Sequence, residues 1–224
     1  MCADGARRFL LLSRSGKLSA EQEEELTALQ SQYSNCVVVV ARCDVTNRKM
    51  VEGVYTDAKI SNLLIERAAI LHFAMLLNDA PVLDMTDAQL TSTLACKVDG
   101  ARNLIEPLIA DVRAQFYMAT EPFTKSIPQN VPLDFVVLFS SISATFGNAD
   151  QANYAAANAF LDAYCLDLIN RGIYARVVNL SGVEDVGVLA QDLRKREITR
   201  QRGLRGGLTA DVRILSQNVA LMFI

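Results

Sequence analysis

Short apolar runs, separated by stretches of helical character, constrain the fold of this chain more than any other feature. Each run is almost entirely apolar, so both faces of the strand that it predicts need to be covered. Strands of this kind that alternate with helices form a parallel sheet with helices on both faces. The sequence therefore predicts an α/β fold with a doubly wound parallel sheet. The runs are residues 9–12, 37–41, 70–74, 133–139 and 176–180, and the helical stretches are residues 21–32, 49–59, 87–93, 97–108 and 153–170.

Two local signals mark the ends of predicted helices. Ser19 is followed three residues later by Gln22, which is the pattern of a capping box at the start of a helix. Gly172 follows the last long helical stretch and is suited to the left-handed conformation that ends a helix. Both signals agree with the helical stretches read from hydrophobic periodicity.

The domain organisation follows from where the alternating pattern weakens. Residues 109–131 are less regular and longer than a usual connection, so we expect a surface insertion there. Residues 194–205 are basic and polar, and residues 210–223 predict a final amphipathic helix. We therefore expect one domain over residues 1–190 and a helical tail over residues 191–224.

Composition excludes several classes of protein. Hydrophobic residues make up 51% of the 224 residues, which excludes a disordered chain. The 22 basic and 25 acidic residues give a net charge of -3, so nothing indicates a nucleic-acid or membrane partner. No apolar run is long enough to span a bilayer, and the first residues do not resemble a signal peptide. We expect a cytoplasmic protein.

The cysteines indicate free thiols. With one histidine in the chain and no closely spaced cysteine pair, a zinc site cannot be assembled, and no metal site is expected. The odd number and wide spacing are typical of a reducing compartment. The five cysteines are Cys2, Cys36, Cys43, Cys96 and Cys165.

Polar side chains follow each predicted strand at its carboxyl end. In a doubly wound sheet, ligands bind at this edge. The helix after the fourth strand adds Tyr154 and Asn158, which are four residues apart and therefore share a face. The residues at the strand ends are Ser13 and Arg14, Asp44 and Val45, His72 and Ala74, and Ser140 and Ser141.

Several long motifs then carry a resemblance to a known family. Ser141 lies thirteen residues before Tyr154, and Asn158 ends the run Tyr-Ala-Ala-Ala-Asn. Together with LLLSRSG at 10–16, CDVT at 43–46 and KVDGARNL at 97–104, this order resembles the ketoreductase domain of polyketide and fatty acid synthases. These domains belong to the short-chain dehydrogenase/reductase superfamily and have a Rossmann-like fold. The resemblance covers residues 6 to 185.

The resemblance implies reduction of a β-ketoacyl thioester to a β-hydroxyacyl thioester by NADPH. By that likeness Tyr154 is the general acid that protonates the developing alkoxide. Lys97 corresponds to the family's lysine, whose ammonium would lower the pKa of the phenol. Asn158 would support the proton relay, and Ser141 would hydrogen-bond the ketone oxygen.

The same resemblance implies a cofactor site. Arg14 is suited to the 2′-phosphate of NADPH because a guanidinium matches phosphate oxygens, and Ser13 would add a hydroxyl donor. Asp44 and Val45 resemble residues that contact the adenine ring. The stretch Leu71-His72-Phe73-Ala74 corresponds to the family's stretch beside the nicotinamide ribose, where Phe73 is larger than the usual residue and would crowd the cofactor. His72 alone is more typical of a packed core histidine.

One expected element of the family is missing from the sequence. No G-x-G-x-x-G turn, which would hold the cofactor's pyrophosphate, follows any predicted strand. The motifs begin at what would be the second strand, so the first β-α unit is absent and a central place in the sheet is left open. Either another element fills that place or the fold is compromised.

Two hypotheses of different class follow. The first is a reductase that acts on an acyl-carrier-linked β-ketoacyl substrate, with the missing unit supplied by another chain or by a longer gene product. The second is a non-catalytic, truncated remnant or scaffold that does not bind NADPH by itself. Residues 194–205 would be a solvated charged face or a docking site for the carrier.

Overall fold

The computed structural model describes residues 2, 6–33, 35–60, 68–117, 133–181 and 220–223. Strands and helices alternate along these residues, as the sequence predicts, and the α/β class is confirmed. The strands are β1 Arg8–Ser13, β2 Val37–Arg42, β3 Ala68–His72, β4 Leu133–Ser141, β5 Ala175–Leu180 and β6 Ala220–Phe223. The helices are α1 Ala20–Gln32, α2 Arg48–Ile60, α3 Asp87–Tyr117, α4 Ser143–Phe146 and α5 Ala152–Asn170.

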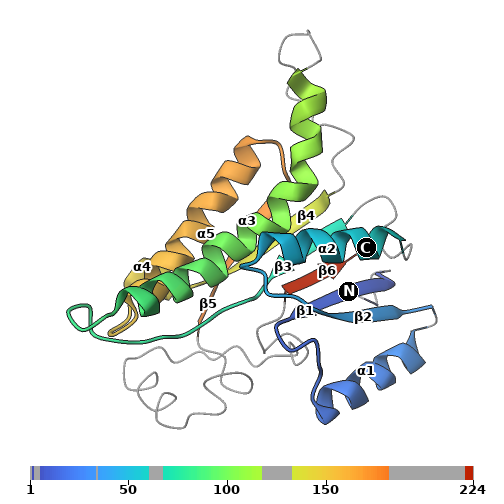
Figure 1. The fold of residues 1–224 in the computed structure, drawn as a ribbon, viewed down its shortest axis with the longest axis horizontal. Coiled ribbons are helices and arrows are strands. Elements are labelled where there is room, and N and C mark those ends of the chain that lie inside the picture. The colour runs from blue at the N-terminus through green and yellow to red at the C-terminus, as the bar shows by residue number, and fades with distance from the viewer. Residues whose placement is uncertain are drawn as a thin grey trace.

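The strands form one sheet in the order β2-β1-β6-β3-β4-β5 (Figure 1). β1 pairs with β2 in parallel, and β3-β4-β5 form a second parallel set. Between these two sets runs β6, which is antiparallel to both β1 and β3. The central place that the sequence predicted to be open is therefore filled by residues 220–223.

The strand β6 corrects the prediction of a helical tail. Residues 220–223 were expected to close an amphipathic helix, and they are extended instead. The physical reason is that β1 and β3 each present a row of backbone donors and acceptors toward the gap, and these groups need partners. Pairing on both sides, Phe9–Leu12 on one and Ala69–His72 on the other, outweighs the helical periodicity of this segment. The other residues of the predicted tail, 191–219, lie outside the described residues.

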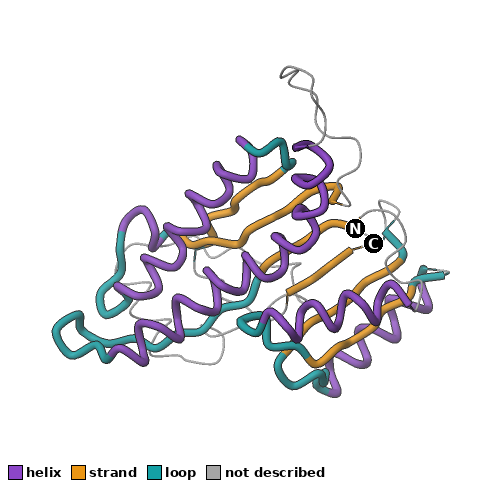
Figure 2. The backbone as a smooth tube through the Cα atoms, turned by 45° about the horizontal axis from the view of Figure 1, so that its top comes forward, coloured by secondary structure: helices purple, strands orange, loops and turns teal. Residues whose placement is uncertain are grey.

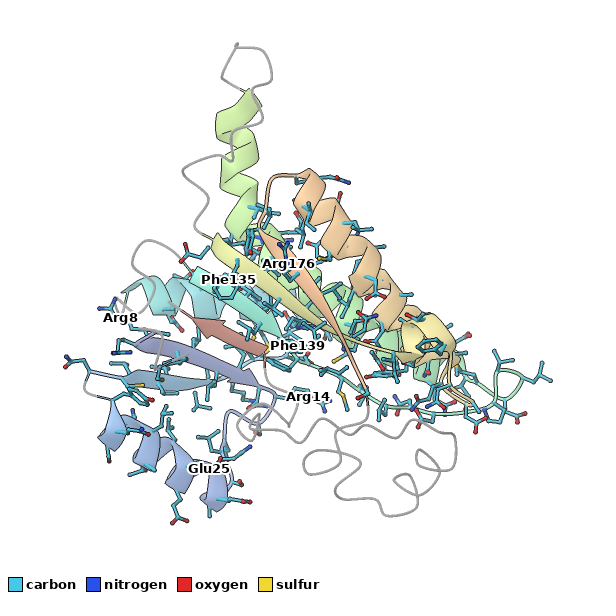
Figure 3. The ribbon with its side chains drawn as sticks, turned by 180° about the vertical axis from the view of Figure 1, so that it is seen from behind. Arg8, Arg14, Glu25, Phe135, Phe139 and Arg176 are labelled. Carbon is cyan, nitrogen blue, oxygen red and sulfur yellow. The ribbon has the colours of Figure 1, made fainter. Side chains whose placement is uncertain are left out.

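Two apolar clusters cover the two faces of the sheet. Helices α2, α3 and α5 lie on one face (Figure 2). They pack against β1, β3 and β4 through buried side chains such as Tyr55, Ile105 and Leu161. On the other face, α1 packs beside β1 and β2, and Phe135 and Phe139 of β4 point to this side (Figure 3). The sheet is thus doubly wound, with most of its buried volume under α2, α3 and α5.

Both predicted helix ends are confirmed. The Ser19 hydroxyl accepts a hydrogen bond from the Gln22 amide at 3.3 Å, and the Gln22 side chain accepts one from the Ser19 amide at 2.9 Å. After α5, Gly172 has φ 80, and the amides of Gly172 and Ile173 donate to Ile169 and Leu168. These two bonds are those of a Schellman motif, which glycine forms without backbone strain.

The helix α3 corrects the predicted insertion in part. It is one continuous helix that includes Pro107 and extends to residue 117, whereas the sequence predicted two helices and an irregular stretch after residue 108. Burial of Leu104, Ile105 and Ile109 against the sheet holds the helix through the proline. Figure 1 shows α3 bending toward its carboxyl end, and proline is a usual cause of such a bend. Residues 118–132 lie outside the described residues.

Ion pairing fastens α3 to α5 at the end away from the predicted site. The Arg171 guanidinium donates to both carboxylate oxygens of Glu106, at 2.7 and 2.8 Å, and the Tyr164 hydroxyl donates to the same carboxylate at 2.8 Å. Such bidentate pairs fix geometry as well as charge. The two helices therefore run side by side in a defined register.

The first prediction concerns β6. Proline at position 221 removes a backbone N–H from a strand that pairs on both sides, so Leu221→Pro weakens the join between β1 and β3. We expect faster amide hydrogen exchange in residues 9–12 and 69–72 than in Leu221→Val, which keeps the N–H. Equal exchange in the two variants would show that β6 does not hold the sheet together.

Candidate active site

The residues Ser141, Tyr154 and Asn158 come together where β4 ends and α5 begins. Ser141 is the last residue of β4, and its hydroxyl accepts a hydrogen bond from the Ser143 amide at 3.2 Å. Tyr154 and Asn158 lie on successive turns of α5, and the Asn158 amide donates to the Tyr154 carbonyl at 2.8 Å. The Ser140 hydroxyl donates to the Asn158 carbonyl at 3.2 Å and fastens α5 to the strand end.

Burial controls the acidity of Tyr154. Desolvation raises the pKa of its phenol, while hydrogen bonds from the side chains of Asn158 and Ser141 lower it, and the net shift is upward. The sequence predicted the opposite net direction, because a nearby ammonium would lower the pKa of the phenol. The effect of burial on this pKa therefore outweighs that of the nearby Lys97 ammonium.

Lys97 reaches this cluster from α3. Its side chain is 2% exposed, its Nζ donates to the Phe139 carbonyl at 2.8 Å, and Nζ lies 5.8 Å from the centroid of the Tyr154 ring. Burial lowers the pKa of Lys97 to about 8, so the amine is mostly charged at pH 7. The structure therefore brings Lys97, Ser141, Tyr154 and Asn158 together, although forty-three residues separate Lys97 from Ser141 in sequence.

Gly100 and Asn103 position α3 and were not singled out from the sequence. A Cβ on Gly100 would lie 2.9 Å from Val45 Cγ2 and 3.1 Å from His72 Cε1, so only glycine allows this approach of α3 to the sheet. The Asn103 amide donates to the carbonyls of Val45 and Thr46, at 2.9 and 3.0 Å. The sequence signal that could have identified these two residues is their place in the KVDGARNL motif.

A pocket of about 180 Å³ lies at the carboxyl ends of β1, β2 and β3, beside α3. Arg14, Asp44, Val45 and Ala74, four of the six predicted cofactor residues, line it. Figure 3 shows Arg14 just beyond the carboxyl end of β1. The other lining residues are Leu12, Cys43, Thr46, Met75, Leu76, Ser92, Ala95 and Cys96.

The other two predicted cofactor residues do not line this pocket. The Ser13 hydroxyl accepts a hydrogen bond from the Gly16 amide at 3.0 Å and thereby closes the turn after β1. His72 is fully buried, and among the described residues neither ring nitrogen has a hydrogen-bond partner. Burial, together with the charge of Lys97, lowers the pKa of His72 to about 3, so the ring is neutral. This is the placement of a core histidine.

Phe73 was expected to crowd the cofactor, and it does not line the pocket either. Its ring stacks on Phe139, with centroids 3.5 Å apart and planes 19° apart. Both side chains pack with the apolar cluster on the α1 side of the sheet. The described residues contain no group of side chains that could hold a metal ion, and none of their helices is long and apolar enough to cross a membrane.

Comparison with known proteins identifies the family of this fold and site. The family model described as "KR domain" matches residues 1–185, which is most of the chain. The chain belongs to the ketoreductase domain family. This confirms the resemblance to ketoreductase domains of polyketide synthases and to the short-chain dehydrogenase/reductase superfamily.

Curated relatives of this ketoreductase domain are much longer than the chain. The highly reducing polyketide synthase ACTTS3 of Alternaria alternata is 33% identical over 197 residues, which cover 88% of this chain and 7% of that protein. The highly reducing polyketide synthase otaA of Aspergillus carbonarius is 32% identical over 203 residues, covering 91% of this chain and 7% of that protein. The chain thus spans a small part of these relatives.

Solved ketoreductases share the fold. PlmKR1, the ketoreductase from the first module of phoslactomycin biosynthesis in Streptomyces sp. HK803, has a TM-score of 0.69 and 28% identity, covering 86% of this chain and 39% of that chain. A structure described as an A1-type ketoreductase has a TM-score of 0.62 and 30% identity, covering 86% of this chain and 35% of that chain. The Rossmann-like ketoreductase fold is therefore shown for this domain.

The close approach at Gly100 gives a stability prediction. Gly100→Ala forces a methyl group against Val45 and His72, and we expect a loss of about 1–3 kcal/mol in the free energy of unfolding. Gly53→Ala is the matched control, because nothing lies within 4 Å of that Cβ position in α2. That change is expected to stabilise the helix by up to about 1 kcal/mol. Urea denaturation measures both, and an undiminished stability of Gly100→Ala would contradict the packing described for α3.

The buried Lys97 gives a pH prediction. Its pKa is about 8 in the folded chain against 10.5 when unperturbed, so between these values the unfolded chain binds more protons. The free energy of unfolding contributed by this group therefore rises with pH over that window, by up to about 3 kcal/mol. We expect urea denaturation at pH 8, 9 and 10 to show this rise as a difference between the parent chain and Lys97→Met. Parallel pH profiles for the two chains would mean that Lys97 is solvated.

Proposed function

We propose that this ketoreductase domain uses NADPH to reduce a β-ketoacyl thioester, carried by an acyl-carrier domain, to a β-hydroxyacyl thioester. Membership of the family implies reduction of β-keto groups by a synthase domain. The observation that carries the proposal for this chain is the cluster of Tyr154, Ser141, Asn158 and Lys97 at one strand end. The cluster contains an acid, a hydroxyl donor and a buried ammonium, which is what protonation of a reduced ketone oxygen requires.

Tyr154 and Ser141 would act on the ketone oxygen. When the carbonyl carbon gains a hydride, negative charge develops on oxygen, and the Ser141 hydroxyl stabilises it by a hydrogen bond. Tyr154 then gives its phenolic proton to that oxygen, which completes the alcohol. NADPH, when bound, supplies the hydride.

Lys97 and Asn158 would act on Tyr154. Loss of the phenolic proton leaves a phenolate in a buried place, where an unpaired charge is unfavourable. The ammonium of Lys97, 5.8 Å from the ring centroid, stabilises that phenolate by its charge. The side-chain hydrogen bond from Asn158 favours the phenolate in the same way. Together these groups let Tyr154 release its proton despite its raised pKa.

The pocket fits one end of NADPH. Arg14, exposed at the pocket edge, would hold the 2′-phosphate, and Asp44 and Val45 would hold the adenine ring. Its volume of about 180 Å³ is smaller than the roughly 300–1,000 Å³ of a typical ligand pocket. The 224 residues contain no glycine-rich turn for the pyrophosphate. The proposal therefore includes a β-α unit supplied from outside these residues, in keeping with relatives of much greater length.

A second candidate function has its own observation. The strand β6 occupies the centre of the sheet and runs antiparallel to both neighbours, in the place where a strand leading into a pyrophosphate-binding turn would otherwise lie. A sheet whose central place is filled by β6 suits a non-catalytic scaffold that does not bind NADPH by itself. The two candidates differ in a measurable property, which is cofactor-dependent turnover.

Steady-state reduction of a β-ketoacyl thioester surrogate distinguishes them. We expect NADPH oxidation by the chain that Tyr154→Phe lowers by about 100-fold or more, because that change removes the general acid and keeps the ring. Tyr174→Phe is the control, since Tyr174 is exposed next to β5. A folded chain with no turnover, even with a β-α unit from a related ketoreductase added, would contradict the reductase, and turnover by the chain alone that depends on Tyr154 would contradict the scaffold.

A further inference from the structure

Asn153, the residue before Tyr154, has an unusually complete set of buried hydrogen bonds. Its side chain is fully buried. Nδ2 donates to the Asn78 carbonyl at 2.9 Å, to the Gln89 carbonyl at 3.2 Å and to the Thr93 hydroxyl at 3.1 Å. Oδ1 accepts a hydrogen bond from the Tyr154 amide at 2.8 Å. The two hydrogens of one amide nitrogen are thus shared among three acceptors.

The four partners belong to three different segments, one of which is α5 itself. Asn78 lies in the connection that follows β3, and Gln89 and Thr93 lie in the first two turns of α3. Thr93 is four residues before Lys97, one turn away on the same face of the helix. A single side chain therefore joins the start of α5, the start of α3 and the connection between β3 and α3.

We infer that Asn153 is a positioning residue, which holds the turn of α5 that carries Tyr154 in register with the turn of α3 that carries Lys97. The effect of Asn153 on turnover rests on the proposed function, whereas its role in holding α3 and α5 in register does not. The site needs such a residue because Tyr154 and Lys97 come from different helices, and the Glu106–Arg171 ion pair joins the far end of α5 to a point beyond the middle of α3. Without Asn153 the ends that carry the site have no buried polar bond between them among the described residues.

Other bonds near this junction are weaker candidates for the same role. Gln151 donates to the Asp79 carboxylate at 3.2 Å, and the Ala80 amide donates to the Asp150 carbonyl at 2.8 Å. The Gln151 bond is solvent-exposed, and neither bond reaches α3. Bonds that water can replace contribute little to rigidity, whereas a buried amide that loses its partners leaves unsatisfied groups behind. Replacement of Asn153 should therefore change the position of Tyr154 relative to Lys97.

The test compares Asn153→Ala with Asn170→Ala. Asn170 is the exposed last residue of the same helix, so the control makes the same chemical change outside the junction. The first readout is amide hydrogen exchange of residues 73–86 and 87–97 in the full chain. The second is the absorbance titration of the Tyr154 phenol, taken as the difference between each chain and the same chain carrying Tyr154→Phe. The charged or titratable groups that act on this phenol are Lys97, Asp79 and Cys96.

We expect Asn153→Ala to speed exchange in both segments by tenfold or more and to lower the pKa of Tyr154 toward the value of a free phenol, about 10. The pKa falls because burial is the largest cause of its elevation, and a loosened junction admits water. Asn170→Ala should leave both readouts unchanged. If Asn153→Ala folds and both readouts match the parent chain, the inference is overturned.

Thr93→Val keeps the inference testable if Asn153→Ala does not fold. Valine has nearly the shape of threonine and removes one of the three acceptors of Asn153, so we expect a smaller change in the same direction for both readouts. Parent-like exchange and titration in Thr93→Val would then overturn the inference. In a chain that turns over, Asn153→Ala should lower kcat by tenfold or more with an unchanged KM for NADPH. A parent chain without turnover, even with the added β-α unit, contradicts the proposed function and leaves the two structural readouts to decide this inference.

Discussion

The site depends on the packing of α3 against α5 on one face of the sheet. Tyr154 and Lys97 lie on different helices, and their distance is set by how those helices are held together. Buried apolar side chains of both helices fill the space above β3 and β4, and polar bonds fix the register at each end. At one end Asn153 contacts Thr93, and at the other Arg171 contacts Glu106. The buried ammonium of Lys97 and the half-buried ring of Tyr154 lie close together because this packing holds their helices side by side.

The second constraint on the site is the strand β6, which joins the two parts of the sheet. The described strands fall into a β2-β1 pair and a β3-β4-β5 set, and the backbone bonds that join them run through β6. Residues from both parts of the sheet line the pocket, since Arg14 and Asp44 follow β1 and β2, whereas Ala74 and Cys96 follow β3. Asn103, on α3, links the same two parts through its hydrogen bonds to the backbone of the turn after β2. The shape of the pocket is therefore linked to the position of a short strand from the end of the chain.

Local and periodic features were predictable from the sequence itself, whereas long-range ones were predictable only where the family resemblance implied them. Apolar runs, the Ser19 capping box, the Gly172 helix end and the spacing of Tyr154 and Asn158 depend on neighbours in sequence, so they follow from local rules. The order of the motifs predicted an open central place in the sheet, but not that residues 220–223 fill it, because that pairing depends on tertiary contacts with β1 and β3. The approach of Lys97 to Tyr154 and the hydrogen bonds of Asn153 likewise depend on tertiary packing. His72 is fully buried, as its residue type alone predicted, while its place beside the cofactor stays a prediction from the resemblance.

The central claim is that the carboxyl edge of this sheet is a reductase site that takes NADPH, with Arg14 at the 2′-phosphate. Titration of the chain with NADPH and NADH, followed by nucleotide fluorescence, tests it most directly. The account predicts saturable binding of NADPH, a preference over NADH, and loss of that preference in Arg14→Ala but not in Arg8→Ala, at the opposite end of β1 (Figure 3). A folded chain that binds neither nucleotide, even with a β-α unit from a related ketoreductase added, or a preference for NADPH that survives Arg14→Ala, would contradict the proposed site.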